Sequence, residues 1–146
     1  MVVLTKILTD KPCHLFSLGY FSEIFGAAKS SISEDILIIK ETLQQYGLGT
    51  LETQAGALGG VEFIPIQSEE NTAKLLHELA VRLSTPERII PGGYLYMSDI
   101  LCVPHLMTAV GEAFRTRFSK LRPDYVMTVE TKGIPLAFMT ARAFNL

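Results

Sequence analysis

Apolar residues recur at helical spacing in three stretches of the first half of the chain. The pattern predicts helices over residues 2–9, 18–25 and 30–46. Ser17 stands at the N-cap position of the second helix, and Gly26 and Gly47 directly follow the second and third helices, as glycines at helix C-termini commonly do. The first half is therefore expected to begin with three short helices.

Alternating apolar and polar residues follow these helices and predict two strands, over residues 49–54 and 61–66. The glycine-rich segment 55–60 between them can close a β-hairpin. Three helices followed by a hairpin is the element order of a winged helix-turn-helix. We therefore expect a winged-helix domain over residues 1–67.

The pattern in the second half of the chain predicts mainly helices, with one strand. Its patterns favour a helix over 71–83, a turn over 91–94, a helix over 104–118, a buried strand over 125–129, a loop over 130–133 and a helix over 134–144. A parallel sheet needs further strands on both sides of this strand-loop-helix unit. We expect residues 68–90 to form a linker or dimerisation helix, and residues 91–146 to be the front part of a larger α/β domain.

Composition bears on the environment of the protein. The chain carries a net charge of −2 and is 48% hydrophobic, with a mean hydropathy of +0.28. No apolar run approaches the roughly 18 residues that cross a bilayer, so the apolar excess indicates a buried interface or a further part of the fold. The first residues do not resemble a signal peptide, which predicts a cytoplasmic protein.

Metal and redox chemistry are disfavoured because such sites need clustered ligands. The candidate ligands are scattered along the chain instead, as Cys13, Cys102, His14, His77 and His105. Ordinary packing and surface roles account for these residues.

The predicted helix over 30–46 has two different faces. On a helical wheel the core side gathers four apolar residues, Ile32, Ile36, Ile39 and Leu43. The far side carries Ser30, Ser33, Glu34, Leu37, Glu41 and Gln44, with Lys29 and Lys40 at its edge. Ser31 and Glu34 fit a capping box, which leaves Leu37 and the other serines unexplained.

A DNA recognition helix explains this outer face. The major groove admits a helix whose N-terminal residues are short enough to approach base edges. The serines and Lys29 can hold phosphates, while Glu34 can accept from a cytosine amino group and Leu37 can contact a thymine methyl. A solvated helix face is the alternative. Residues 1–66 contain four lysines against seven acidic residues, a net charge of −3, which is poor for binding phosphates.

Several motifs together carry a resemblance to a known family. They are Lys29–Asp35, Gly47–Leu51, Gly59–Val61, Pro86–Ile89, Pro91–Tyr96, Ser98–Leu101 and Val126–Ala137. In one register along essentially the whole chain, they resemble the N-terminal portion of the bacterial purine operon repressor family.

The resemblance implies an α+β chain: a winged helix followed by an incomplete phosphoribosyltransferase-like domain. In that family the second domain has no known transferase activity and binds phosphoribosyl pyrophosphate as an effector, which weakens repression of purine synthesis genes. A homodimeric DNA-binding repressor without a metal or cofactor is implied. DNA contacts are expected on the helix beginning at Lys29 and at the hairpin tip over 56–60, namely at Lys29, Ser30, Ser31, Ser33, Glu34, Leu37, Lys40, Gly59 and Gly60.

The chain departs from the family at two points. Family members carry a basic segment before the first helix, and their main effector-binding loop would lie beyond Leu146. The chain is therefore expected to be the front half of such a repressor.

Part of an effector site is nevertheless expected. The loop before the last helix offers Thr131, Lys132 and Gly133 to a pyrophosphate, and Tyr94 is a further candidate, with a packing role as its alternative. The basic run at the end of the preceding helix is a solvated face or a contact for DNA or a second subunit; it comprises Arg115, Arg117, Lys120 and Arg122.

Two other functions stay open. One is an enzyme, the front part of a purine phosphoribosyltransferase; the other is a dimerisation fragment without a ligand. The sequence shows neither the acidic pair that binds ribose nor a general base with a partner, so a regulator rather than an enzyme is predicted.

Overall fold

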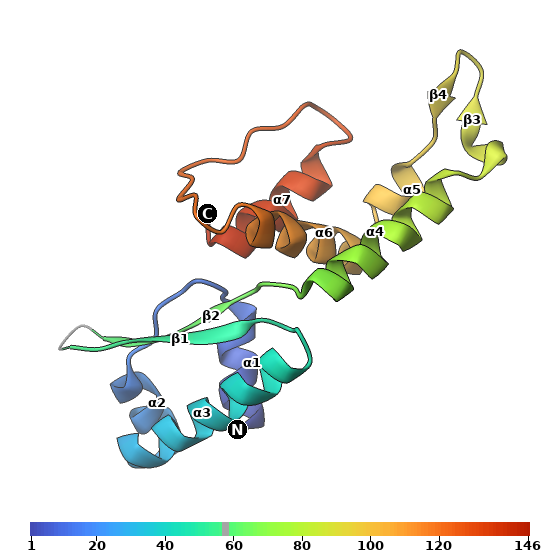
Figure 1. Cartoon of the computed structure of the whole chain (residues 1–146). Helices are drawn as coiled ribbons and strands as arrows, with labels where there is room; N and C mark the ends of the chain where they lie inside the picture. Colours follow the sequence, from blue (N-terminus) through green and yellow to red (C-terminus); the bar gives the residue numbers. More distant parts are fainter. Residues whose placement is uncertain (57–58) are drawn as a thin grey trace. The chain divides into compact units, whose positions relative to one another are not determined.

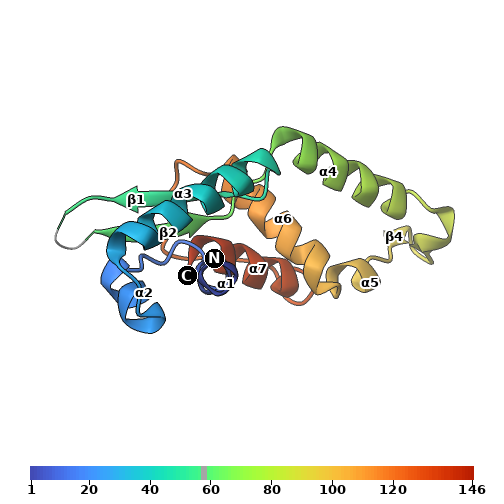
Figure 2. The same ribbon diagram turned by 90° about the horizontal axis from the view of Figure 1, so that it is seen from below.

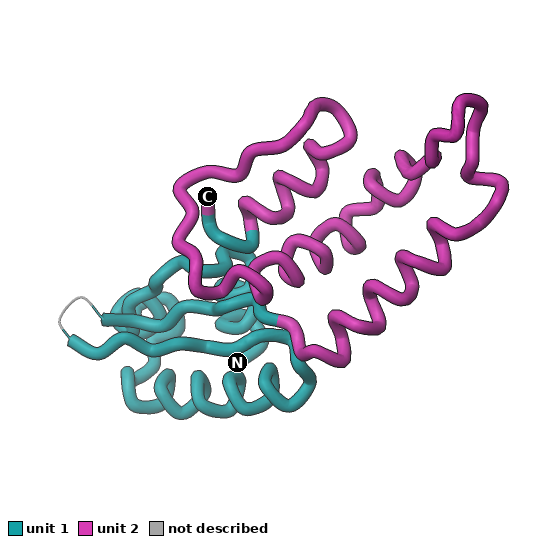
Figure 3. The backbone as a smooth tube through the Cα atoms, turned by 45° about the horizontal axis from the view of Figure 1, so that its top comes forward, with its two compact units in different colours: residues 1–66, 143–145 teal, residues 67–142, 146 magenta. Residues whose placement is uncertain are grey.

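The computed structural model describes residues 1–56 and 59–146 (Figure 1). The chain divides into two compact units, residues 1–66 with 143–145 and residues 67–142 with 146 (Figure 3). Ala57 and Leu58 of the predicted hairpin turn lie outside the described residues.

The first unit contains the predicted helices and strands within about two residues of their expected bounds. The elements are α1 (Val2–Asp10), α2 (Leu18–Phe25), α3 (Lys29–Gln45), β1 (Thr50–Gln54) and β2 (Gly60–Ile64). β1 and β2 pair antiparallel, with Thr50 opposite Ile64 and Gln54 opposite Gly60. Backbone hydrogen bonds between Phe16 and Val61 form an isolated antiparallel bridge on the other edge of β2. Three helices and a β-hairpin wing make this unit a winged helix.

The core of this unit fixes which face of α3 points outward. The four predicted apolar residues of α3 are all buried, packed with Leu4 and Leu8 of α1, Phe21 of α2 and the inner residues of the wing. Burying one such side chain contributes about 1.5–3 kcal/mol, so any rotation of α3 about its axis is strongly opposed. The polar face of α3 is exposed as a consequence.

The predicted capping box at Ser31 and Glu34 is wrong. The N-cap of α3 is Ala28, whose extended backbone precedes the helix and whose side chain makes no capping bond. The Ile32 amide donates to the Ala28 carbonyl at 3.2 Å, so the helix is already formed at Ser31. The helix begins earlier than the serine signal suggested, because the backbone is extended at Ala28 and already helical from Lys29 onward.

The second unit is mainly helical. It contains α4 (Glu69–Leu83), a 3₁₀ turn η1 (Pro86–Arg88), β3 (Ile89–Ile90), β4 (Tyr94–Leu95), α5 (Ser98–Leu101), α6 (Pro104–Arg117) and α7 (Ile134–Phe144). The long helices and the turn over 91–94 confirm the predictions, whereas the small β3–β4 hairpin and α5 were not foreseen. Among the described residues, no helix has both the length and the apolar character to cross a membrane.

Packing in the second unit centres on α6. Leu106 and Met107 of α6 are buried with Leu75 of α4 and Ile100 of α5. α6 and α7 lie side by side (Figures 1 and 2), and a side chain at Gly111 would collide with the backbone of Met139 in α7. The absence of a side chain at Gly111 therefore allows the two helices to approach closely.

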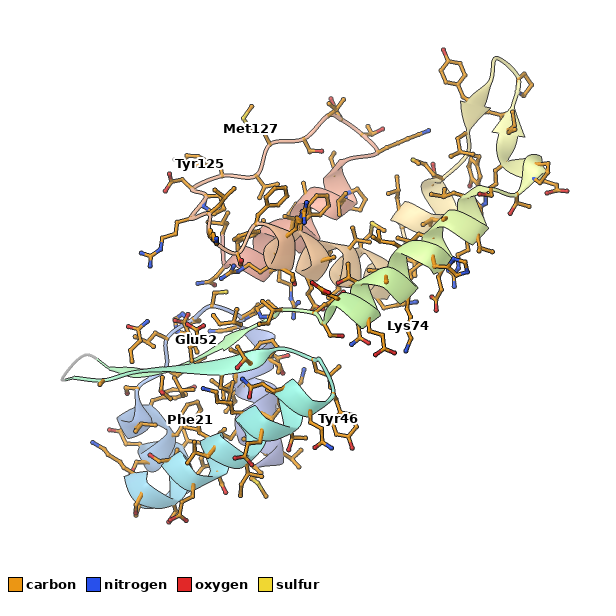
Figure 4. All side chains as sticks on the ribbon, viewed as in Figure 1. Phe21, Tyr46, Glu52, Lys74, Tyr125 and Met127 are labelled. Carbon is orange, nitrogen blue, oxygen red and sulfur yellow. The ribbon has the colours of Figure 1, made fainter. Side chains whose placement is uncertain are left out.

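The predicted buried strand over 125–129 is wrong. This segment is irregular, and Tyr125, Met127 and Val129 are more than four-fifths exposed. The side chain of Met127 projects away from α7 (Figure 4). Apart from the isolated bridge at Phe16, every described residue in a paired strand belongs to β1–β2 or β3–β4. An apolar run becomes a strand only when a neighbour pairs with its backbone.

Candidate nucleic-acid interface

A groove of about 620 Å³ runs across the first unit between its helices and the wing. Three elements line it: residues 17–19 at the start of α2; Lys29, Ser33, Ile36 and Leu37 of α3; and residues 53–56, Gly59 and Gly60 of the wing. One wall of the groove is therefore the N-terminal half of the predicted recognition helix.

The α3 side of the groove carries a charged, a polar and an apolar side chain on successive turns of the helix. Lys29, Ser33 and Leu37 are four residues apart, so they form one stripe along the helix. The Ser33 hydroxyl donates to the Lys29 carbonyl at 2.9 Å, which leaves the oxygen of that hydroxyl as an acceptor. Leu37 is 59% exposed, and the structure gives this apolar side chain no place in the core.

The glycines of the wing have structural reasons of their own. A side chain at Gly60 would collide with the carbonyl of Phe16, and one at Gly59 would collide with the carbonyl of Gln54. The Gly59 amide donates to the Gly56 carbonyl at 3.0 Å, within the hairpin turn. Gly60, which is buried, lets the wing lie close to the segment before α2, while the half-buried Gly59 lets the hairpin turn close.

The structure brings together five of the nine predicted DNA-binding residues in this groove: Lys29, Ser33, Leu37, Gly59 and Gly60. Ser30 and Glu34 are exposed beside it. Ser31 lies about 200° around the helix from Lys29, so it faces away from this stripe. Lys40 continues the stripe beyond the groove and is half-buried.

Residues that sequence reasoning missed line the other walls. Ser17 accepts from the Tyr20 amide as the N-cap of α2, and Thr53 and Gln54 end β1 on the groove side. In the sequence, Ser17 was recognised only as the N-cap of a helix. The periodicity of the β1 strand did not indicate that its last residues, Thr53 and Gln54, line the groove. Their place in the groove depends on strand pairing, which is a long-range property.

The charges around the groove are unusual for a nucleic-acid interface. Among the described residues, Lys29 is the one cationic residue that lines it. Glu52 and Glu62 stand opposite each other on the wing strands but are not among the residues that line the groove. The side-chain amide of Gln54 donates to the Glu62 carboxylate at 3.1 Å. A phosphate at this face would therefore meet Lys29 and backbone amides rather than a basic patch.

The second unit places three predicted effector residues in one turn. Thr131 and Lys132 are exposed there, directly before α7. The Gly133 amide donates to the Val129 carbonyl at 3.2 Å, and a side chain at Gly133 would collide with Thr128. Glycine is therefore required for this turn to close against the preceding segment.

Tyr94 is not brought to this turn. It belongs to β4, where its side chain is 69% exposed and its ring lies against Gly92 of the same hairpin. The hairpin and the turn are separate projections of the second unit (Figure 1).

A winged helix whose third helix and wing enclose an open groove defines a class of DNA-binding domain. The comparison with known families agrees: the family described as bacterial purine repressor, N-terminal, matches residues 1–65. The whole chain is also similar to proteins named as purine biosynthesis regulators.

The relatives extend over the whole chain. It is 47% identical over 146 residues to the purine biosynthesis transcriptional repressor PurR of Bacillus subtilis (strain 168), covering 51% of that protein. It is 38% identical over 146 residues to the purine biosynthesis transcriptional activator PurR of Lactococcus lactis subsp. lactis (strain IL1403), covering 54%. The chain thus spans about half the length of these curated relatives.

A shorter match joins the chain to an enzyme. Over 69 residues it is 33% identical to the xanthine phosphoribosyltransferase of Geobacillus thermodenitrificans (strain NG80-2), covering 45% of this chain and 36% of the enzyme.

Proposed function

We propose that this chain is a DNA-binding part of a transcriptional repressor of purine biosynthesis genes, acting in the cytoplasm as a homodimer. The observation that carries the proposal is the groove between the N-terminal half of α3 and the wing, with Lys29, Ser33 and Leu37 in one stripe. The matched family and the named regulators support it.

Repression rather than activation is proposed from the same comparisons. One relative is named a repressor at 47% identity and another an activator at 38% identity. The greater similarity to the repressor favours repression. Whether the bound protein blocks or recruits polymerase depends on where its site lies in the promoter, so the DNA-binding proposal is common to both.

Each predicted DNA-contact residue of α3 and of the wing has a proposed role at the duplex. Lys29 and Lys40 neutralise phosphates, and Ser30 and Ser33 donate or accept hydrogen bonds at the helix N-terminus. Ser31 faces away from the groove stripe, so its contact with DNA is proposed on the resemblance alone. Glu34 accepts from a cytosine amino group, and Leu37 contacts a thymine methyl. Gly59 lets the wing backbone approach the DNA strand, and Gly60, which is buried against Phe16, holds the wing in place for this contact.

We propose the same domain limits that the sequence suggested. Residues 1–67 form the winged helix, residues 68–90 a linker or dimerisation helix, and residues 91–146 an incomplete phosphoribosyltransferase-like domain. The 69-residue match to xanthine phosphoribosyltransferase supports a phosphoribosyltransferase-like part within the chain. Transferase activity is not part of the proposal because the relatives that match the whole chain are named transcriptional regulators.

The proposed effector is phosphoribosyl pyrophosphate, which relieves repression. Thr131, Lys132 and Gly133 would contact its pyrophosphate through backbone amides and one ammonium group, at the start of α7. Tyr94 is proposed for the same ligand on resemblance alone.

Titration of a purine-gene control duplex against a scrambled duplex, at about 0.1 M salt, tests the proposal. We expect the control duplex to bind at least about tenfold more tightly, because base contacts add to phosphate contacts. Phosphoribosyl pyrophosphate should weaken the specific complex. Equal affinity for both duplexes would contradict a repressor, and turnover of the effector with a purine base would favour an enzyme.

A further inference from the structure

α4 is an outermost helix of the second unit, because α6 lies between it and α7 (Figures 1 and 2). The inner side of α4 packs on α6 through Leu75, which is buried, and through Leu79, which is partly buried. A further leucine of the same helix, Leu76, is 56% exposed. Its side chain therefore lies largely outside the core of the second unit.

Leu76 belongs to a heptad pattern along α4. Ala73 and Leu76 are repeated seven residues later by Ala80 and Leu83. At about 100° per residue, these four side chains fall within an arc of about 80°, beside the face that holds Leu75. Ala73 and Ala80 are exposed, and Leu83 is half-buried. These four residues are called the outer face of α4 below.

Most charged residues of α4 lie away from the outer face. They are spaced four apart and comprise Glu70, Lys74, Glu78 and Arg82. Lys74 pairs with Glu70 at 2.7 Å, and its side chain points away from α6 (Figure 4). Glu69 comes into line with the outer face only in the first turn, before Ala73. A second helix can therefore approach the outer face without burying a charge.

The outer face is complementary to itself when two copies run antiparallel. If Leu76 of one copy lies opposite Ala80 of the other, twofold symmetry repeats this contact in reverse, and Ala73 and Leu83 face each other in the same way. Every layer then pairs one leucine with one alanine, so the side chains interlock at an even spacing of the helices. A parallel pair would set leucine against leucine and leave a gap between facing alanines.

The area of the outer face suits a weak dimer. Pairing along this face buries roughly 400 Å² per copy, about half of the 800 Å² that each partner contributes to a standard interface. Exposed apolar surface that is not needed for the fold is typical of association sites. Dimerisation through α4 alone is therefore expected in the micromolar range.

We infer that the outer face of α4 is a dimerisation surface, and that its occupant is the same face of a second copy, arranged antiparallel about a twofold axis. The inference deepens the proposed homodimer and rests on that part of the proposed function. Periodicity alone does not separate the outer face from the buried one, because Leu75, Leu79 and Leu83 also have helical spacing. The exposure of Leu76 distinguishes the two.

Sedimentation velocity of the chain without DNA, over about 1 to 200 µM protein, tests this surface. We expect the parent to dimerise in the upper part of this range. Leu76→Glu should raise the dimer dissociation constant at least about tenfold, because it would bury a charge opposite an alanine.

Val81→Glu is the matched control for this experiment. Val81 is 60% exposed and lies about 140° from Leu76 around the helix, so this variant should dimerise like the parent. Circular dichroism should show both variants folded. A parent that stays monomeric at about 200 µM, or parent-like dimerisation of Leu76→Glu, would overturn the proposal.

A mixing experiment tests the antiparallel arrangement. Leu76→Glu and Ala80→Lys should each dimerise poorly alone, whereas their equimolar mixture should regain dimers, because the introduced carboxylate of one copy would face the introduced ammonium group of the other. A mixture of Leu76→Glu and Leu76→Lys is the control, which a parallel pair alone would rescue. No recovery in the first mixture would overturn the arrangement. Both experiments omit DNA, so a failure to bind DNA would refute the proposed DNA-binding function without changing their outcome.

Discussion

At the scale of single residues, Gly60 shows how a structural constraint underlies the groove. Gly60 lies opposite Gln54 in the hairpin and directly precedes Val61, whose backbone pairs with that of Phe16. The reason is the absence of a side chain rather than an unusual φ, since a Cβ would meet the Phe16 carbonyl. The start of α2 reaches the wing only because of this approach.

Gly60→Ala should therefore destabilise the first unit by about 1–3 kcal/mol, the usual effect of forcing atoms into a packed site. Urea unfolding followed by circular dichroism measures it. Gly19→Ala is the matched control, because its Cβ would lie 3.6 Å from the Ser17 hydroxyl oxygen, an ordinary contact. Equal stability of the two variants would contradict the close approach described for Gly60.

Glu112 is the residue at which charge and burial conflict. Burial in the second unit raises the pKa of its carboxyl group, while the Gln67 hydrogen bond and the charge of Arg142 act in the opposite direction. A raised pKa means that the folded state holds the proton more tightly. Its contribution to stability is therefore present below the ordinary value of 4.5 and is lost as the pH rises through the raised value.

Glu112→Gln should remove this dependence. The difference in unfolding free energy between Glu112→Gln and the parent should be near zero at low pH and should grow in favour of the variant toward pH 7. Comparing the two proteins cancels the titration of all other groups. A difference that is constant with pH would show that burial does not perturb this carboxyl group.

At the scale of elements, α3 shows what the sequence predicts well. Its apolar stripe at Ile32, Ile36, Ile39 and Leu43 has helical periodicity, and this local pattern identified both the helix and its buried face. The start of the helix was harder, since Ser31 is a good cap residue in isolation and Ala28 is not. Backbone conformation at Ala28, not cap preference, decides the boundary.

The wing and the segment over 125–129 mark the limit of local patterns. The alternation in β1 and β2 predicted two strands, and they do pair. The run from Tyr125 to Val129 has the same apolar character without a partner strand among the described residues. The groove walls at Thr53 and Gln54 likewise follow from pairing between distant residues, which periodicity does not encode.

At the scale of the whole molecule, charge is the feature that most constrains the proposed function. Residues 1–66 carry a net charge of −3, and within the described part of the chain Lys29 is the one cation that lines the groove. A basic run follows in the second unit, at Arg115, Arg117, Lys120 and Arg122. Its part in binding DNA or a second subunit stays a prediction. Specific binding is therefore expected to depend on base and backbone contacts of α3 more than on phosphate neutralisation.

The most direct test of this account is duplex binding by fluorescence anisotropy at several salt concentrations, comparing the parent with Ser33→Glu, Lys29→Ala and the control Gln45→Ala. The account predicts a loss of at least about tenfold for Ser33→Glu, which places a negative charge in the groove, and a salt slope reduced by about one for Lys29→Ala. Gln45→Ala should bind like the parent. Parent-like binding by Ser33→Glu and Lys29→Ala would contradict the claim that the α3 groove reads DNA.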